Sequence, residues 1–273
     1  MSDSSGRVNI AYLLEDWARR YPRGQAVVES CAYDSVGRAA YSHLSFSRLD
    51  ELSDAMAWAL SDFGIRRGCK CVLMVSPGLD FAALTFALFK IGAVIVMIDP
   101  GMGLRNLGKC LDEVEAESFI GIPKAHVARI LFRWSHNSLE KLVTLGRRWF
   151  WGGLNLYAAL EEKVNSFPIH QAEPDEMAAI LFTSGSTGVA KGAVYTHGIF
   201  NQQVSMLRDC FHFQPGDRDL ATFPLFALFD PLLGVTAVIP DMDASKPAKA
   251  SPTMLLDPRK VQNCNQMFAA QAL

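Results

Sequence analysis

The chain has 273 residues, half of them hydrophobic, so it can bury a large core and is long for a single domain. Its 26 basic and 28 acidic residues give a net charge of −2, which gives no support to a nucleic-acid-binding protein. The six cysteines show no Cys-x-x-Cys pair and no zinc-ligand spacing, which indicates no metal site and predicts reduced thiols in a cytoplasmic protein.

The first part of the chain alternates between amphipathic helices and apolar strands. Its N-terminus, MSDSSGRVNI, lacks the apolar stretch of a secretory signal. The elements expected next are helices over 9–22, 46–63, 79–91 and 104–115, and strands at QAVVES, 70–76 and 93–98. Because these strands are apolar throughout, we predict an α/β fold of layered, mostly parallel sheets with helices on both faces.

One apolar segment approaches the length of a transmembrane helix. Residues 81–98, FAALTFALFKIGAVIVMI, carry a single charge, at Lys90. However, Lys90 and Gly92 are typical of a helix end, and the β-branched run that follows stops at Asp99 and Pro100. We therefore predict a helix followed by a buried strand, and no integral membrane segment.

A basic and aromatic cluster, RRWFW at 147–151, follows two expected short strands at 117–123 and 141–146. Two interpretations stay open for it: a contact with a membrane surface or nucleic acid, and an ordinary amphipathic surface segment. Residues 152–176 then turn polar and irregular, which is typical of a boundary between domains. We predict an N-terminal α/β subdomain over 1–170 and a partial second one over 171–273.

In the second subdomain we expect helices over 197–210, near 230–235 and from about 258 onward. Strands are expected over 219–226 and 236–242. The chain would then stop at Leu273 directly after a helix, where a doubly wound sheet places another strand. The predicted architecture is therefore truncated.

The most specific chemical signal is TSGSTGVAKG, residues 183–192, directly after the apolar run MAAILF. Phosphate oxygens need many donors at close range; glycines allow that approach, hydroxyl groups donate, and one lysine neutralises charge. The residues expected to bind phosphate are Thr183, Ser184, Gly185, Ser186, Thr187, Gly188, Lys191 and Gly192. A Ser/Gly-rich surface linker is the alternative, but linkers seldom follow a buried strand with this spacing.

The spacing of this loop excludes two other phosphate-binding motifs. A Walker A loop needs Gly before its lysine and Ser or Thr after it, whereas Lys191 lies between Ala190 and Gly192, and GxGxxG is absent. This disfavours a P-loop kinase or ATPase. What remains, G-S-T-G-x-x-K-G, resembles the phosphate-binding signature of the adenylate-forming superfamily, in which proline usually stands where this chain has Ala190.

Three further stretches resemble the β-lactone synthetases of bacterial olefin biosynthesis, and more distantly fatty-acyl-CoA ligases: MIDPGMG (97–103), FPLFALFDP (223–231) and AVIPDMD (237–243). The resemblance implies the N-terminal subdomains of the adenylate-forming fold. It implies ATP and Mg²⁺ as cofactors and a long-chain fatty or 3-hydroxy fatty acid as substrate. The acid would be activated as an acyl-adenylate, and its hydroxyl could then close a β-lactone and release AMP.

By the same resemblance, residues 183–192 hold the β- and γ-phosphates, and Lys191 stabilises charge on the leaving pyrophosphate. FPLFALF matches the acyl-pocket motif, so the expected lining is Phe223, Leu225, Phe226, Ala227 and Phe229. These aromatic side chains could instead belong only to the core, and His197 is expected to be structural. The family's magnesium, ribose and adenine motifs are expected beyond Leu273.

Three kinds of function therefore stay open: an incomplete adenylate-forming ligase, a fatty-acyl-CoA ligase fragment, and a non-catalytic remnant that binds nucleotide or acyl chains. Association with other lipid-biosynthesis enzymes is a further expectation from the resemblance. Pyrophosphate exchange separates an enzyme from a remnant.

Overall fold

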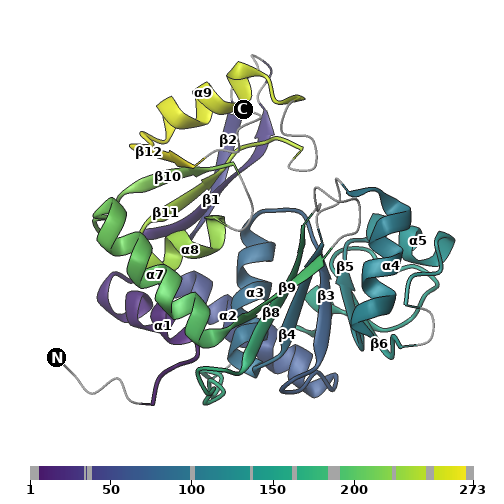
Figure 1. Ribbon diagram of the computed structural model, residues 1–273. Helices are drawn as coiled ribbons and strands as arrows, with labels where there is room; N and C mark the ends of the chain where they lie inside the picture. Colours follow the sequence, from purple (N-terminus) through teal and green to yellow (C-terminus); the bar gives the residue numbers. More distant parts are fainter. Residues whose placement is uncertain are drawn as a thin grey trace. The chain divides into compact units, whose positions relative to one another are not determined.

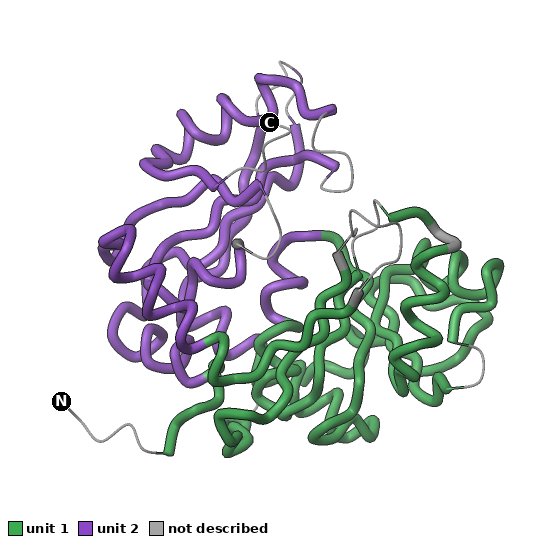
Figure 2. Tube along the Cα trace, viewed as in Figure 1, with its two compact units in different colours: residues 1–11, 53–76, 84–200 green, residues 12–52, 77–83, 201–273 purple. Residues whose placement is uncertain are grey.

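The computed structural model describes residues 6–33, 35, 39–98, 102–135, 138–161, 165–183, 191–222, 226–243 and 249–268. The chain forms two compact units, each assembled from several stretches (Figure 2). Unit 1 comprises residues 1–11, 53–76 and 84–200, and unit 2 comprises residues 12–52, 77–83 and 201–273. Because each unit is made of several stretches of the chain, this division does not test the predicted boundary between residues 170 and 171, which stays a prediction.

Unit 1 is built on a seven-stranded sheet with the order β7-β6-β5-β3-β4-β8-β9 (Figure 1). All neighbouring strands are parallel except β8 and β9. The strands are β3 (Lys70–Met74), β4 (Val94–Ile98), β5 (Ser118–Gly121), β6 (Lys141–Thr144), β7 (Leu154–Asn155), β8 (Met177–Thr183) and β9 (Lys191–Thr196). Three helices lie wholly within this unit: α4 (Leu104–Val114), α5 (Pro123–Leu131) and α6 (Leu156–Ala159).

Unit 2 contains a five-stranded sheet with the order β12-β10-β11-β1-β2, parallel except for β1 and β2. Its strands are β1 (Gln25–Tyr33), β2 (Ala39–Ser45), β10 (Arg218–Ala221), β11 (Thr236–Ile239) and β12 (Gln266–Phe268). Its helices are α8 (Phe226–Leu233), α9 (Pro252–Val261) and nearly all of α1 (Ala11–Arg20). Helices α2 (Phe46–Asp62), α3 (Leu79–Ile91) and α7 (His197–Phe211) carry residues of both units. The predicted α/β class with mostly parallel sheets is thus confirmed.

Within unit 2, the stretch 12–52 packs against the stretch 201–273 where the Trp17 ring lies close to Gly234. The indole Nε1 of Trp17 donates to the carbonyl oxygen of Leu232 at 3.0 Å. Gly234 has φ +81°, and a Cβ there would lie 2.6 Å from the Trp17 ring. Both the backbone conformation and the space therefore require glycine at position 234.

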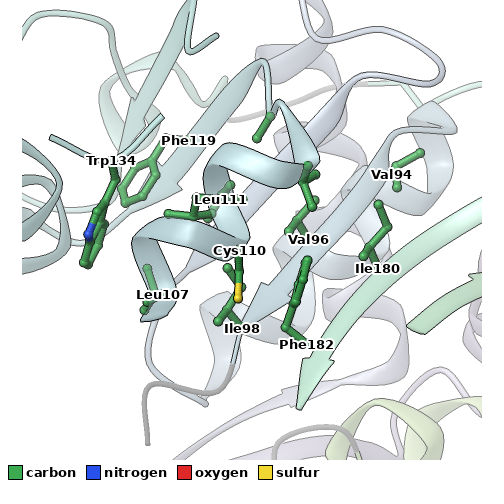
Figure 3. Close-up of a cluster of buried hydrophobic side chains, with 13 residues drawn as sticks. Val94, Val96, Ile98, Leu107, Cys110, Leu111, Phe119, Trp134, Ile180 and Phe182 are labelled. Carbon is green, nitrogen blue, oxygen red and sulfur yellow. The ribbon is translucent and has the colours of Figure 1, made fainter. Parts of the chain in front are cut away.

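One hydrophobic cluster of unit 1 lies between its sheet and α4. Figure 3 shows Leu107, Cys110 and Leu111 of α4 in one buried cluster with side chains of β4, β5 and β8. Those side chains belong to a buried cluster that includes Val96, Ile98, Ile180 and Phe182. Because strands of a parallel sheet are covered by helices, their sequences read as continuous apolar runs.

The apolar segment 81–98 folds as predicted. Helix α3 ends at Ile91, Gly92 takes φ +78°, and β4 begins at Val94. Among the described residues, no helix is both long enough and apolar enough to cross a bilayer.

Several other sequence-based boundaries are wrong. Helix α9 begins at Pro252 rather than near Pro258, because Ser251 caps it by accepting a hydrogen bond from the amide of Met254 at 3.4 Å. Strand β12 follows α9 and pairs with β10, so the expectation that no strand follows the last helix is also wrong. Helix α8 begins at Phe226, four residues earlier than expected. Helix α5 and strand β2 were not predicted.

Candidate functional site

The predicted phosphate loop connects two paired strands. Ser184, Gly185, Ser186, Thr187 and Gly188 lie outside the described residues, as do the side chains of Thr183 and Lys191. The backbone at both ends of the loop is described: Thr183 ends β8, Lys191 begins β9, and the two residues pair directly in an antiparallel register. Seven residues therefore join adjacent strands, and the expected short strand between loop and helix is confirmed as β9.

The loop follows β8 at the carboxyl edge of the parallel part of the sheet. Strand β8 runs parallel to β4, with Ile98 opposite Phe182, so both strands end at the same edge. In open α/β sheets this edge is where ligands bind. The stretch 99–101, which follows β4, lies outside the described residues.

Packing at the base of the loop favours glycine at position 192. A Cβ there would lie 2.9 Å from Cζ of Phe182 and 3.0 Å from Cγ2 of Ile180, so these two side chains would have to shift. Gly192 pairs with Phe182 across the strands and is absent from the glycines with positive φ. Its structural role is thus to let β9 lie close against β8, whereas its predicted phosphate contact stays a prediction.

His197, at the start of α7, is fully buried in unit 1. Its Nδ1 accepts a hydrogen bond from the amide of Ile10 at 3.3 Å, and its ring meets that of Phe89 edge-on at 6.0 Å. Burial lowers the pKa of His197 to about 4, so the imidazole is neutral at pH 7. These contacts support the structural role that was expected for this side chain.

The predicted acyl-pocket residues are described only in part. Phe223, Leu225 and the side chain of Phe226 lie outside the described residues. Ala227 is 4% exposed and Phe229 is half-buried, and both belong to α8. The expected strand over 219–226 ends at Ala221, so these two positions lie on a helix rather than next to a strand end.

Unit 2 contains a buried carboxyl pair that was not predicted from the sequence. Asp219 on β10 and Asp230 on α8 are each no more than 2% exposed. The Oδ1 of Asp219 accepts a hydrogen bond from the amide of Phe268 at 3.2 Å. The Oδ2 atoms of both aspartates lack a partner among the described residues unless one carboxyl is protonated and donates to the other.

Burial raises the pKa of Asp219 to about 6, and burial together with the charge of Asp219 raises that of Asp230 further above its usual range. One proton therefore stays in the pair near neutral pH. The two residues lie eleven positions apart on different elements, so no local pattern revealed them.

The described residues contain no group of three His, Cys, Asp or Glu side chains that could hold a metal ion. The expectation that this chain lacks the magnesium ligands stays a prediction.

The fold is that of adenylate-forming ligases. A long-chain-fatty-acid-CoA ligase from Archaeoglobus fulgidus superposes with a TM-score of 0.79 at 18% identity, covering 95% of this chain and 51% of that chain. The N-terminal domain of FACL13 from Mycobacterium tuberculosis gives a TM-score of 0.71 at 21% identity, covering 92% of this chain and 61% of that chain. The expected N-terminal subdomains are thereby confirmed.

The chain belongs to the AMP-binding enzyme family, whose model matches residues 14–250. It is 48% identical over 269 residues to an olefin beta-lactone synthetase from Stenotrophomonas maltophilia, covering 97% of this chain and 48% of that protein. A long-chain-fatty-acid–CoA ligase from Mycobacterium tuberculosis is 26% identical over 247 residues, covering 87% of this chain and 46% of that protein. The chain thus spans about half the length of these relatives, and the resemblance expected from the motifs is confirmed.

Proposed function

We propose that the protein containing this chain activates a long-chain 3-hydroxy fatty acid with ATP and then closes a β-lactone. The observation that carries the proposal is the TSGSTGVAKG loop at the carboxyl edge of β8, in a chain 48% and 46% identical to two olefin beta-lactone synthetases. Two relatives with that name favour lactone closure over the more general activation of a fatty acid.

In the proposed reaction a carboxylate oxygen attacks the α-phosphorus of ATP, and the bond from that phosphorus to the bridging oxygen breaks. Pyrophosphate leaves, and the acid is held as its acyl-adenylate. The 3-hydroxyl oxygen then attacks the acyl carbon, AMP leaves, and the hydroxyl proton passes to solvent. Mg²⁺ would be needed to bind and neutralise the ATP phosphates.

The residues of this chain would supply binding and charge in the first step. Residues 183–188 and Gly192 would donate hydrogen bonds to the β- and γ-phosphates, and Lys191 would stabilise the charge that develops on pyrophosphate. The pairing of Thr183 with Lys191 supports this arrangement, because it holds both ends of the loop at one position on the sheet. Ala227 and Phe229 on α8, with Phe223, Leu225 and Phe226, would contact the acyl chain.

ATP–pyrophosphate exchange tests the proposal. Exchange should depend on a long-chain 3-hydroxy fatty acid, and Lys191→Ala should lower its rate by roughly 10²-fold, the cost of losing one transition-state donor. Lys260→Ala, which changes an exposed lysine on α9, is the matched control and should leave the rate unchanged. An unchanged exchange rate in Lys191→Ala would refute the role of the loop.

Product analysis separates the remaining alternatives. A β-lactone with AMP supports the proposal, whereas an acyl-CoA formed only when CoA is added indicates the fatty-acyl-CoA ligase alternative. Binding of nucleotide or acid without exchange indicates a non-catalytic remnant. A cytoplasmic location and association with other lipid-biosynthesis enzymes remain part of the proposal.

A further inference from the structure

A loop in unit 1 exposes two large aromatic side chains at its tip. Residues 145–153, here called the aromatic loop, join β6 to β7. Phe150 is 79% exposed and Trp149 is 53% exposed, while Arg147 and Arg148 beside them are also exposed. Two adjacent aromatic side chains that are exposed to water are unfavourable in solvation free energy. An exposed apolar patch of this kind is typical of an interaction site.

The aromatic loop is held in a defined shape by Trp151. The Trp151 ring stacks on His126 of α5, with centroids 5.0 Å apart and planes 9° apart, and its Nε1 donates to Oγ1 of Thr144 at 2.9 Å. Gly153 has φ +80°, and a Cβ there would lie 2.1 Å from the carbonyl oxygen of Leu142. Packing and backbone conformation therefore fix the base of the loop.

The exposed rings are supported by this base. The centroids of Trp149 and Phe150 each lie 5.5 Å from that of Trp151. The guanidinium of Arg148 donates a hydrogen bond to the carbonyl oxygen of Gly153, which closes the loop. Little conformational entropy would thus be lost when the tip binds a partner.

Basic residues are concentrated around the aromatic loop in the sequence. Residues 123–159, from the start of α5 to the end of α6, contain six of the 26 basic residues of the chain but one of its 28 acidic residues. The acidic residue is Glu140, and the basic residues are Lys124, Arg129, Arg133, Lys141, Arg147 and Arg148. This region is therefore positively charged in a chain whose net charge is −2.

We propose that the aromatic loop docks the protein on the surface of an anionic phospholipid bilayer. Trp149 and Phe150 would enter the interface between headgroups and acyl chains, where aromatic side chains are favoured. Arg147 and Arg148 would contact lipid phosphates, which attract basic residues near the surface. This inference does not depend on the proposed function.

The number and kind of side chains favour a bilayer over nucleic acid. Two arginines neutralise few phosphates, and nucleic-acid affinity at physiological salt requires many such contacts. Stable attachment to a membrane instead combines an apolar insertion with a basic patch, and the aromatic loop supplies both.

Cosedimentation of the 273-residue chain with vesicles tests the proposal. The vesicles contain phosphatidylcholine alone or with about 30 mol% phosphatidylglycerol, in about 0.1 M salt. The chain should sediment with the anionic vesicles and much less with the neutral ones. Arg147→Gln/Arg148→Gln should weaken partitioning about 30-fold, and Trp149→Ala/Phe150→Ala should weaken it at least about tenfold.

Matched variants control for charge and apolar area. Arg19→Gln/Arg20→Gln changes two adjacent exposed arginines on α1, and Met206→Ala changes a side chain on α7 that is 60% exposed. Both should partition as the unchanged chain does. Melting temperatures of all variants should stay close to that of the unchanged chain, because the contacts that the loop variants lose, the Arg148 hydrogen bond and the rings against Trp151, belong to one exposed loop.

Three results would overturn the proposal. One is equal partitioning onto neutral and anionic vesicles, and another is loop variants that sediment as the controls do. The third is a chain that sediments with neither kind of vesicle but binds a single-stranded oligonucleotide, with binding lost in Trp149→Ala/Phe150→Ala. That result would assign the loop to nucleic-acid binding instead.

Discussion

A buried ion pair in unit 1 gives a quantitative test of the packing around α3. Lys90, the single charge in the apolar segment 81–98, places its Nζ 2.5 Å from Oδ1 of Asp54 on α2. The two side chains are 1% and 8% exposed. Neither charge can be rehydrated without opening the core, so each should depend strongly on the other.

Removing one partner should be costly, and removing both should be far less so. Lys90→Met leaves a buried carboxylate and Asp54→Ala a buried ammonium, and each should lower the free energy of unfolding by about 3–5 kcal/mol. The double variant leaves no buried charge, only a small cavity near position 54. We therefore expect it to be more stable than either single variant, with a coupling free energy of at least about 2 kcal/mol.

Urea unfolding followed by far-ultraviolet circular dichroism measures all four proteins of the cycle. The exposed pair of Arg48 and Glu51, whose side chains are 67% and 54% exposed, is the control. Its cycle should give a coupling of less than about 1 kcal/mol. If the effects of Lys90→Met and Asp54→Ala add to within about 0.5 kcal/mol, the reasoning is refuted.

Two further predictions concern stability. The folded pKa of Asp219 is raised from 3.8 to about 6, so the folded state binds the extra proton, and stability is lost as pH rises from about 4 to about 6. Asp219→Asn should therefore raise the melting temperature at pH 8 and flatten its fall between pH 4 and 8, because it removes the group that titrates there; an unchanged slope contradicts this. Gly192→Ala should cost about 1–3 kcal/mol in urea unfolding, because its Cβ would overlap Phe182, whereas Gly6→Ala, with nothing within 4 Å, should cost little; equal effects would argue against the packing role.

Elements with long apolar runs could be predicted well from the sequence. In 81–98 the helical run, Gly92 and the β-branched run each indicate a different backbone conformation, and all three agree with α3 and β4. Strand β2 was missed because the apolar residues of AAYSHLS do not alternate with polar ones, and the strand contains no fully buried position. It forms because it pairs with β1, which is information that its own residues do not contain.

The start of the last helix was predicted from the wrong proline. A helix was expected from about Pro258 onward, but Pro258 lies inside α9. Pro252 occupies the first turn of α9, where a missing N–H costs nothing, and this makes it the better start signal. When a segment contains two prolines, the cap residue before the first decides between them, and here that residue is Ser251.

The residue types of the loop at 183–192 predict its chemistry, whereas the pairing of strands β8 and β9 determines its position on the sheet. Glycines, hydroxyls and a lysine predict phosphate chemistry, but they do not say what holds the loop in place. Strand pairing does so at its base, because Thr183 pairs with Lys191 and Gly192 packs against Phe182. The backbone position of Lys191 thus depends on the register of β8 and β9.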